Sequence, residues 1–456
     1  MKNLFGTDGM RGAAGEFPLD PATVRIVGSS LARHLEEKFS RAPVIVLGRD
    51  TRESGPWLEA ALIEGATAAG AECHSAGVIT TPGVAFLTRT LPADAGVVIS
   101  ASHNPYHDNG IKIFAPSGRK LDDATERLIE ADIFANTPVP KPTSHKEFLT
   151  NDADELHSRY LDYLVRDIGN ELSLSGLSIA VDCANGAASS LAPTLFARLG
   201  AKVFPINNRP DGKNINRDSG SLHMAGLREV VLSRRVDLGV GFDGDADRAL
   251  FIDRDGNFVD GDATLYVLAN YFQARGELNN QIVVATVMSN IGLELALRER
   301  GVKLIRTDVG DKYVLDELIR SGATLGGEQS GHIIMPRLSL AGDGMITSLC
   351  LLRAIRQSGQ SLKQLITPFR RYPQVLVNVR VATKRPFAEL EDVSNAATEI
   401  EKKLSGRGRL LLRYSGTEPL ARIMIEGPDQ AEIESYASRL RSMIERVLGP
   451  PERALE

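Results

Sequence analysis

The chain has 456 residues, of which 43% are hydrophobic and 24% charged, and this composition predicts a globular protein with roughly three or four domains. The formal net charge of −5 argues against a nucleic-acid partner, because a phosphate backbone requires clustered excess Lys and Arg. No run of about 18 apolar residues is present, so we expect no membrane helix. Cys73, Cys183 and Cys350 are far apart in the sequence, which excludes a disulfide framework and favours a cytoplasmic protein.

Three segments of the chain share one pattern of strand, helix and strand. Such βαβ units predict mostly parallel sheets that are covered by helices. Each copy has a first apolar run (44–47, 178–182 and 281–286), a helical pattern (57–69, 189–199 and 293–300) and a second apolar run (71–77, 201–206 and 302–306).

Each copy is followed by one more apolar run that ends in an unusual polar loop, after which a further strand resumes. Ligands of open α/β sheets bind beyond the carboxyl ends of the strands, so we expect these three loops to face a shared cleft. The apolar runs are 95–100, 236–242 and 322–326, and the strands that resume are 111–114, 249–252 and 332–335.

The segment from about residue 372 has the order strand, helix, strand, strand and helix, which is typical of a separate α+β domain. The predicted fold class is therefore α/β, with three related mixed α/β domains that contain βαβ units and a C-terminal α+β domain around one central cleft. We place the domains at 1–153, 154–254, 255–368 and 369–456.

Three carboxylates at alternate positions, Asp243, Asp245 and Asp247, directly follow the second of these apolar runs. If the run is a strand, the carboxylates leave its carboxyl end together and repel one another unless a divalent cation lies between them. Mg²⁺ is the obvious candidate. A calcium loop of the EF-hand type is excluded, because Arg248 and Arg254 occupy the places of its Gly and Glu. A solvated acidic turn is the alternative interpretation.

Ser102 lies in the first polar loop, where Asn-Pro and Asn-Gly dipeptides indicate an exposed turn. The G-x-S-x-G pattern of a serine hydrolase is absent around it. A serine that carries a phosphoryl group needs a cation to offset about two negative charges, and basic groups to steady the phosphoryl group. The three aspartates can supply the metal site, with Lys112 and Arg248 as basic partners. Taken alone, Ser102 is more typical of a structural turn.

The remaining polar loops offer groups that suit a phosphorylated sugar. Glu328, Ser330 and His332 combine donors and acceptors, as sugar hydroxyls require, although a solvated turn is the alternative. A C-terminal loop combines guanidinium forks, hydroxyls and a glycine-permitted nest of amides, which favours phosphate binding over a charged surface turn. Its candidate residues are Arg413, Ser415, Gly416, Thr417 and Arg422.

Two further side chains are candidates near the serine loop. Arg11, in a glycine-rich N-terminal segment, can reach a reacting phosphoryl group, and we expect His103 to hold the serine loop by hydrogen bonding. Zinc ligation by His103 and His107 is improbable because Pro105 breaks a helix between them. The Gly pattern at 239–244 formally matches a dinucleotide fingerprint, but the carboxylates that follow it would repel a pyrophosphate.

Taken together, these loops resemble those of the α-D-phosphohexomutase family, and the resemblance covers essentially the full length. The segments 100–105, 243–248, 327–332 and 413–419 are similar to the family's phosphoserine, metal, sugar-recognition and phosphate loops, in that order. Gln329 and the segments 5–12 and 307–314 favour the glucosamine branch of the family. Tyr414 departs from the family pattern, since Pro is usual at this position.

The resemblance implies that phosphorylated Ser102 donates its phosphoryl group to glucosamine 6-phosphate or glucosamine 1-phosphate and interconverts them through glucosamine 1,6-bisphosphate, which supplies UDP-N-acetylglucosamine synthesis. It implies one Mg²⁺ per chain, a hexosamine phosphate as partner and a homodimer. Either Lys112 or His332 is the candidate base. The implied roles are catalytic for Ser102, His103, Lys112, Arg11, Arg248 and His332, substrate-binding for Glu328, Ser330, Arg413, Ser415, Gly416, Thr417 and Arg422, and metal-binding for Ser102, Asp243, Asp245 and Asp247.

Three alternatives to this activity stay open at this point. A phosphomannomutase or phosphoglucomutase specificity belongs to the same family. A metal-dependent sugar phosphatase would use the aspartates without a phosphoserine. A non-catalytic sugar-phosphate sensor would bind without turnover.

Overall fold

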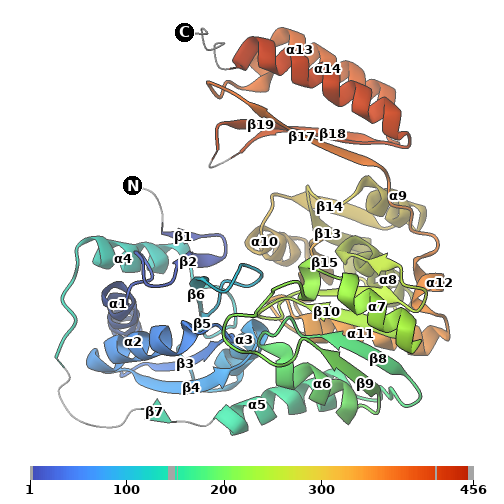
Figure 1. Cartoon of the computed structure of the whole chain (residues 1–456). Helices are drawn as coiled ribbons and strands as arrows, with labels where there is room; N and C mark the ends of the chain where they lie inside the picture. The colour runs from blue at the N-terminus through green and yellow to red at the C-terminus, as the bar shows by residue number, and fades with distance from the viewer. Residues whose placement is uncertain (1–3, 142–148, 151–152, 416–417, 450–456) are drawn as a thin grey trace. The chain divides into compact units, whose positions relative to one another are not determined.

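The computed structural model describes residues 4–141, 149–150, 153–415 and 418–449 (Figure 1). The chain divides into two compact units. The first unit comprises Met1–Met288 and Leu304–Ile366, and the second comprises Ser289–Lys303 and Thr367–Glu456.

Three sheets repeat one four-strand arrangement, with the orders β6-β5-β3-β4, β11-β10-β8-β9 and β16-β15-β13-β14. In each, the strand that precedes the polar loop pairs parallel with the first strand of the βαβ unit and antiparallel with the strand that resumes. The strands are β3 (Val44–Arg49), β4 (Glu72–Val78), β5 (Ala95–Ile99), β6 (Asp108–Phe114), β8 (Ser178–Asp182), β9 (Lys202–Ile206), β10 (Leu238–Phe242), β11 (Ala249–Asp253), β13 (Ile282–Thr286), β14 (Lys303–Thr307), β15 (Leu325–Gly327) and β16 (Ile333–Ile334).

Short strands extend these sheets at their edges. The hairpin β1 (Phe5–Gly6) and β2 (Gly9–Ala13) adds to β6, β7 (Leu149–Thr150) pairs with β4, and β12 (Phe258–Val259) pairs with β11. The N-terminal segment is therefore tied to the same strand, β6, that carries Lys112.

Helices connect the strands, and several begin at a side chain that accepts hydrogen bonds from the first free amides. Asp20, Thr80, Asp260 and Asp343 cap α1, α3, α8 and α11 in this way. The helices of the first unit include α1 (Pro21–Phe39), α2 (Gly55–Ala68), α3 (Thr81–Thr90), α4 (Asp123–Phe134), α5 (Ala153–Asp162), α6 (Ala188–Arg198), α7 (Ala225–Arg234), α8 (Gly261–Ala274), α10 (Asp311–Ser321), α11 (Gly344–Ser358) and α12 (Leu362–Ile366).

The second unit contains the predicted C-terminal domain, in the order β17 (Gln374–Arg380), α13 (Glu391–Leu404), β18 (Arg409–Tyr414), β19 (Leu420–Glu426) and α14 (Gln430–Leu448). Its antiparallel sheet has the order β17-β19-β18, and buried aliphatic side chains such as Ile400, Ile423 and Leu440 form its core. Helix α9 (Ile291–Glu299) also belongs to this unit, since the buried Glu426 accepts a hydrogen bond from the Ile291 amide at 3.1 Å.

The fold class is confirmed, with three mixed α/β domains and a C-terminal α+β domain. One predicted strand begins too early, because 322–326 opens on the C-cap of α10, which ends at Ser321. Gly322 adopts a φ of 66° there and caps the helix in the left-handed conformation that glycine favours, so β15 begins only at Leu325.

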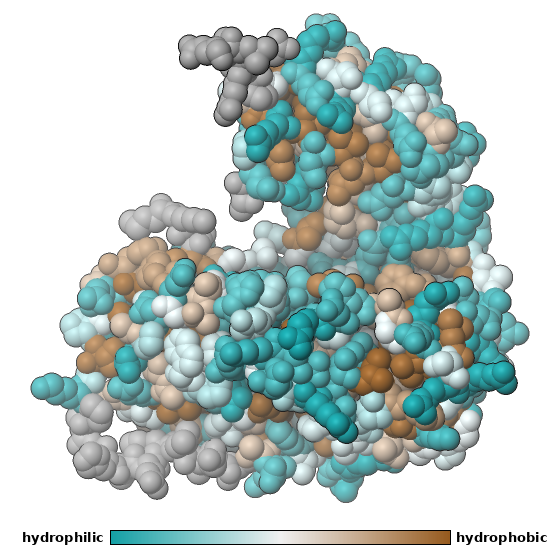
Figure 2. All heavy atoms as spheres, in the orientation of Figure 1, coloured by the Kyte–Doolittle hydropathy of each residue, from teal (hydrophilic) through white to brown (hydrophobic). Residues whose placement is uncertain are grey.

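Hydrophilic residues cover much of the face shown in Figure 2, interrupted by small hydrophobic patches. No helix in the described part of the chain combines the length and apolar character that crossing a membrane requires.

Candidate active site

The three polar loops of the first unit converge at one cavity of about 530 Å³. Each loop lies where the last parallel strand of its sheet, β5, β10 or β15, turns back into an antiparallel neighbour. This common position is the physical reason that the loops meet, because each sheet presents the same strand end. The cavity lining includes Thr7, Asp8, Arg11, His103, Asp247, Arg248, Asp311, Glu328 and His332.

The three aspartates form a compact, buried group of oxygen ligands. One carboxylate oxygen from each of Asp243, Asp245 and Asp247 lies within 4.8 Å of the others. The Oδ1 atoms of Asp245 and Asp247 are buried and have no hydrogen-bond partner among the residues that the structure describes. Burial of acceptor oxygens without donors is costly unless a cation satisfies them. These residues therefore fit a hard divalent cation.

The Ser102 hydroxyl lies beside this group and donates a hydrogen bond to Asp243 Oδ2 at 2.7 Å. Ser102 is fully buried and has a φ of 51°, a left-handed conformation that is uncommon for a residue with a side chain. The metal loop approaches so closely that a Cβ at Gly244 would lie 2.5 Å from the Ser102 carbonyl oxygen. Glycine at this position therefore permits the contact between the two loops.

The strained serine loop is held by two side chains that the sequence did not single out. Arg52 is fully buried and donates hydrogen bonds to the carbonyl oxygens of Ser102, at 3.2 Å, and Asn104, at 2.6 Å. Asn216 donates to the same two carbonyl oxygens, at 2.9 and 3.1 Å. The charged sequence directly after β3 was an available signal for Arg52, because that strand ends at the same edge of the sheet.

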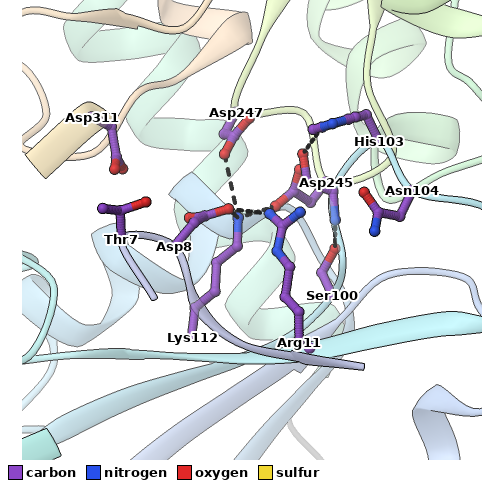
Figure 3. Close-up of polar contacts among 12 residues, drawn as sticks. Thr7, Asp8, Arg11, Ser100, His103, Asn104, Lys112, Asp245, Asp247 and Asp311 are labelled. Carbon is purple, nitrogen blue, oxygen red and sulfur yellow. Dashed lines mark hydrogen bonds and ion pairs between the residues drawn. The ribbon is translucent and has the colours of Figure 1, made fainter. Parts of the chain in front are cut away.

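Lys112 extends from β6 into the centre of the acidic group (Figure 3). Its Nζ lies 2.9 Å from Asp245 Oδ2, 3.4 Å from Asp247 Oδ2 and 3.3 Å from Asp8 Oδ2. Burial opposes the charged form of Lys112, but Asp245 and Asp8 raise its pKa well above the usual value. At neutral pH, Lys112 is therefore a cation among carboxylates.

Asp8 links the N-terminal hairpin to this centre, and the sequence reasoning missed it. Its carboxylate pairs with Arg11, with Lys112 and, at 2.7 Å, with Lys120 Nζ. Although burial opposes ionisation, these cations hold the pKa of Asp8 far below the usual range. Lys120 also pairs with Asp311 Oδ2 at 2.7 Å, which connects the hairpin to the start of α10. Asp8 thus holds Arg11 and Lys112 in place together.

The aspartates differ in their electrostatics. Burial, followed by Asp247 and Asp245, raises the pKa of Asp243 well above its usual value. For Asp247, burial acts in the same direction but is outweighed by Lys112 and His332, so its pKa is lowered. A divalent cation among the three would stabilise the charged form of each carboxylate, including Asp243.

His103 lies between the serine and a guanidinium group. Its Nδ1 is 3.3 Å from Ser102 Oγ and 3.1 Å from Arg248 Nη1. Because a guanidinium only donates, this Nδ1 atom accepts the hydrogen bond from Arg248. Burial and the neighbouring Arg248 lower the pKa of His103 to about 4, so the ring is neutral at pH 7. The structure thus places His103 where it orients Arg248 beside the serine.

His332 and the sugar-recognition loop form another part of the cavity. The His332 ring lies between Asp247, at 3.6 Å, and Asp311, at 3.8 Å. Burial opposes its protonation, but Asp247 and Asp311 raise its pKa to about 9. Ser330 Oγ donates to Glu328 Oε2 at 3.1 Å, and the Gly310 amide donates to Glu328 Oε1 at 3.2 Å. The carboxylate of Glu328 is thereby fixed at the cavity wall.

The C-terminal loop lies in the second unit, between β18 and β19. Arg413 and Arg422 are directly opposite each other on these antiparallel strands. Like charges in this position repel, and a bound anion relieves the repulsion. Arg422 Nη2 lies 3.4 Å from Ser415 Oγ, and Lys384, which the sequence reasoning missed, donates to the Ser415 carbonyl oxygen at 2.5 Å. The predicted residues Gly416 and Thr417 lie outside the described residues.

Comparison with known proteins agrees with this geometry. Profiles of the phosphoglucomutase/phosphomannomutase alpha/beta/alpha domains I, II and III match residues 2–139, 158–256 and 260–372, and the C-terminal domain profile of the same family matches 376–443. The chain belongs to the phosphoglucomutase/phosphomannomutase family, the α-D-phosphohexomutases. Within this family, the chain is 48% identical over 451 residues to the phosphoglucosamine mutase of Solibacter usitatus, with 98% of this chain and 99% of the relative covered. The phosphoglucosamine mutase of Deinococcus radiodurans is 48% identical over 447 residues, with 97% and 98% covered.

Solved phosphohexomutase structures share the fold at lower identity. A phosphoglucomutase/phosphomannomutase family protein from Burkholderia thailandensis aligns with a TM-score of 0.80 and 22% identity, over 97% of each chain. The N-acetylphosphoglucosamine mutase of Aspergillus fumigatus, solved with GlcNAc-6P and magnesium, aligns with a TM-score of 0.61 and 18% identity, over 97% of this chain and 95% of that one.

Proposed function

We propose that the protein is a phosphoglucosamine mutase, which interconverts glucosamine 6-phosphate and glucosamine 1-phosphate through a phosphoserine at Ser102. The observation that carries this proposal is the hydroxyl of Ser102, 2.7 Å from Asp243 and beside a carboxylate group that fits a divalent cation. Full-length relatives at 48% identity that are named phosphoglucosamine mutase support the amino-sugar substrate.

In the first step, the bond between phosphorus and Ser102 Oγ breaks, and a bond forms between phosphorus and the free hydroxyl oxygen of the sugar phosphate. The product is glucosamine 1,6-bisphosphate, and the sugar hydroxyl loses its proton. In the second step, the bisphosphate presents its other phosphoryl group, Ser102 Oγ is phosphorylated again, and the other monophosphate leaves. Bisphosphate added from solution would phosphorylate an unmodified Ser102, so it also acts as an activator.

The side chains around Ser102 suit the charges of these steps. Lys112, Arg11 and Arg248 would steady the transferring phosphoryl group, with Arg248 oriented by His103. Glu328 and Ser330 would orient the sugar hydroxyls.

The aspartates would hold Mg²⁺ through Asp243, Asp245 and Asp247, together with an oxygen of phosphorylated Ser102. When bound there, this cation offsets the negative charge of the phosphoryl group. The mutase of Aspergillus fumigatus was solved in complex with magnesium, which supports this choice of metal.

Proton transfer involves Lys112 or His332. Both side chains are protonated at neutral pH in this structure, because nearby carboxylates raise the pKa of each. Each therefore starts as a proton donor, suited to return a proton to the leaving oxygen, and the one that serves as base must first lose its proton. In a variant that retains only one of these two side chains, the pH dependence of turnover shows whether the remaining side chain acts as the acid or as the base.

The C-terminal loop would bind the phosphate group that is not being transferred. Arg413 and Arg422 provide paired guanidinium groups, and Ser415, Gly416 and Thr417 add hydroxyls and amides. One such loop serves both orientations of the bisphosphate, because either phosphate can occupy it.

The deciding experiment measures conversion of glucosamine 6-phosphate to glucosamine 1-phosphate with Mg²⁺ and a trace of the bisphosphate, together with phosphate incorporation at Ser102. Ser102→Ala should lower turnover by at least about 10⁴-fold, as loss of a nucleophile does in other enzymes. Phosphate release by Ser102→Ala would favour a sugar phosphatase, and binding without turnover by the wild type would favour a sensor. Faster turnover of glucose or mannose 1-phosphate would assign another branch of the family.

A homodimer and a cytoplasmic location, which the family resemblance implies, stay predictions. The domain boundaries at 153, 254 and 368 do so as well. Sedimentation of the purified protein tests directly whether it is a homodimer.

A further inference from the structure

One metal ligand, Asp245, receives a hydrogen bond from a helix that belongs to the domain of the serine loop. The hydroxyl of Thr81, the first residue of α3, donates to Asp245 Oδ2 at 2.6 Å. The amide of Thr81 also donates to the Asp245 carbonyl oxygen, at 3.0 Å. Thr81 is 3% exposed, and it is 164 positions from Asp245 in the sequence. Both contacts are therefore tertiary and protected from water.

These donors act on one side of the carboxylate only. Asp245 Oδ2 accepts from Thr81 Oγ1 and from Lys112 Nζ, while Oδ1 has no hydrogen-bond partner among the described residues. Two donors on Oδ2 fix the rotation of the carboxylate and leave Oδ1 available for a cation. Lys112 alone fixes it less well, because Lys112 is shared with Asp8 and Asp247.

The backbone at the start of α3 also contacts the metal loop. Thr80 caps this ten-residue helix, and its hydroxyl oxygen accepts from the Gly83 amide at 3.1 Å. The Thr81 amide, which has no acceptor within the helix, is satisfied by the metal loop instead. The start of α3 thus holds the metal loop through its backbone as well as through the Thr81 hydroxyl.

We infer that Thr81 is a positioning residue for the divalent cation, which turns Asp245 Oδ1 toward the metal and joins the metal loop to the domain that carries Ser102. The inference rests on the cation site of the proposed function. Groups that orient metal ligands in this way typically contribute a factor of about 10–100 to metal affinity.

The test uses Mn²⁺ as a probe, since its free concentration is measured by electron paramagnetic resonance without any turnover. Thr81→Val has the same shape but lacks the hydroxyl, and we expect its dissociation constant for Mn²⁺ to rise at least about tenfold. Thr81→Ser retains the hydroxyl and should bind within about threefold of the wild type. In turnover assays, Thr81→Val should need correspondingly more Mg²⁺ for half-maximal activity, with an unchanged KM for the sugar phosphate at saturating Mg²⁺.

Thr88→Val is the matched control, because Thr88 is buried in the same helix and its hydroxyl donates only to the Val84 carbonyl oxygen, at 2.7 Å. It should bind Mn²⁺ as the wild type does. Equal Mn²⁺ affinity of Thr81→Val and the wild type would overturn the inference, as would equal weakening in Thr81→Ser and Thr81→Val.

Failure of the proposed function has a different signature. If the wild type binds Mn²⁺ but shows no mutase activity, the binding series still decides the role of Thr81. If Asp245→Asn binds Mn²⁺ as tightly as the wild type, the cation lies elsewhere, and both the metal assignment and the role of Thr81 are overturned.

Discussion

The two charged regions of this protein are built in opposite ways. Around Ser102, cations and carboxylates are buried together, and the Lys112 side chain is 1% exposed between Asp245 and Asp247. In the C-terminal loop, Arg413 and Arg422 face each other on adjacent strands, and the Arg422 side chain is 30% exposed. The first region carries its compensating charges within the protein. The second is compensated only in part, since Arg422 pairs with Glu418 at 3.0 Å while Arg413 and Lys384 add further positive charge that a ligand can neutralise.

This difference separates contributions to folding from contributions to ligand binding. A buried ion group contributes to folding and to catalysis, because removal of one partner leaves the other desolvated and unpaired. The guanidinium group of Arg422 is half-buried and keeps part of its contact with water, so its removal affects the binding of an anion more than the fold. Substitutions in the two regions should therefore differ in whether they change stability or substrate binding.

Lys112→Met should destabilise the fold and abolish most activity, because it leaves Asp245 and Asp247 without their shared cation. The free energy of unfolding in urea should fall by about 3–5 kcal/mol without Mg²⁺, and turnover by at least about 10²-fold. Added Mg²⁺ should restore part of the stability, since it neutralises the same carboxylates. Lys363→Met, which breaks the exposed pair with Asp255, is the control and should unfold like the wild type. If Lys112→Met were as stable as the wild type, Lys112 would not stabilise the buried carboxylates around it.

The buried side chain of Asp343 should make the free energy of unfolding depend on pH. It caps α11 and accepts a hydrogen bond from the Tyr160 hydroxyl at 2.7 Å. Burial raises the pKa of Asp343 from 3.8 to about 6, so the folded protein binds this proton more tightly than the unfolded chain does. The stabilising contribution is therefore complete below about pH 4 and is lost as the pH rises through about 6.

Asp343→Asn lacks this titration and isolates it. The difference in unfolding free energy, wild type minus Asp343→Asn, should decrease by about 2.4 kcal/mol between pH 4 and pH 7, since one pKa unit corresponds to about 1.4 kcal/mol and a small part of the change occurs below pH 4. Urea unfolding across this range measures the difference. A constant difference would show that Asp343 has an ordinary pKa in the folded state.

Arg422→Ala should affect substrate binding and leave stability intact. Loss of a charge-assisted hydrogen bond to phosphate should lower kcat/KM for glucosamine 6-phosphate by about 10–100-fold. The unfolding free energy should change by less than about 1 kcal/mol, because loss of the repulsion with Arg413 offsets loss of the pair with Glu418 at 3.0 Å. Arg441→Ala, which removes the exposed ion pair with Glu445 on α14, should change neither quantity. Destabilisation by Arg422→Ala with an unchanged KM would instead assign Arg422 a structural role.

Tyr414 stands out in the sequence, but its structural role is evident only from its contacts. The sequence identifies it as a departure from the family pattern. In the structure, its ring stacks on Phe387 with centroids 4.4 Å apart, and its hydroxyl donates to the Arg385 carbonyl oxygen. Tyr414 therefore belongs to the packing that supports the phosphate loop, and these partners lie on a preceding segment that no local pattern connects with it.

The repeated βαβ pattern, the three loops at strand ends and the chemical types of Ser102 and the three aspartates are all evident in the amino-acid sequence alone. These features are local, because apolar periodicity and the polar residues that interrupt it are read within one segment. The pairing of Ser102 with Asp243 and the support from Arg52, Asp8 and Thr81 follow from the folded arrangement instead. Such contacts join residues that are often more than 100 positions apart, as for Ser102 and Asp243, which are 141 positions apart. Their geometry depends on how the sheets pack.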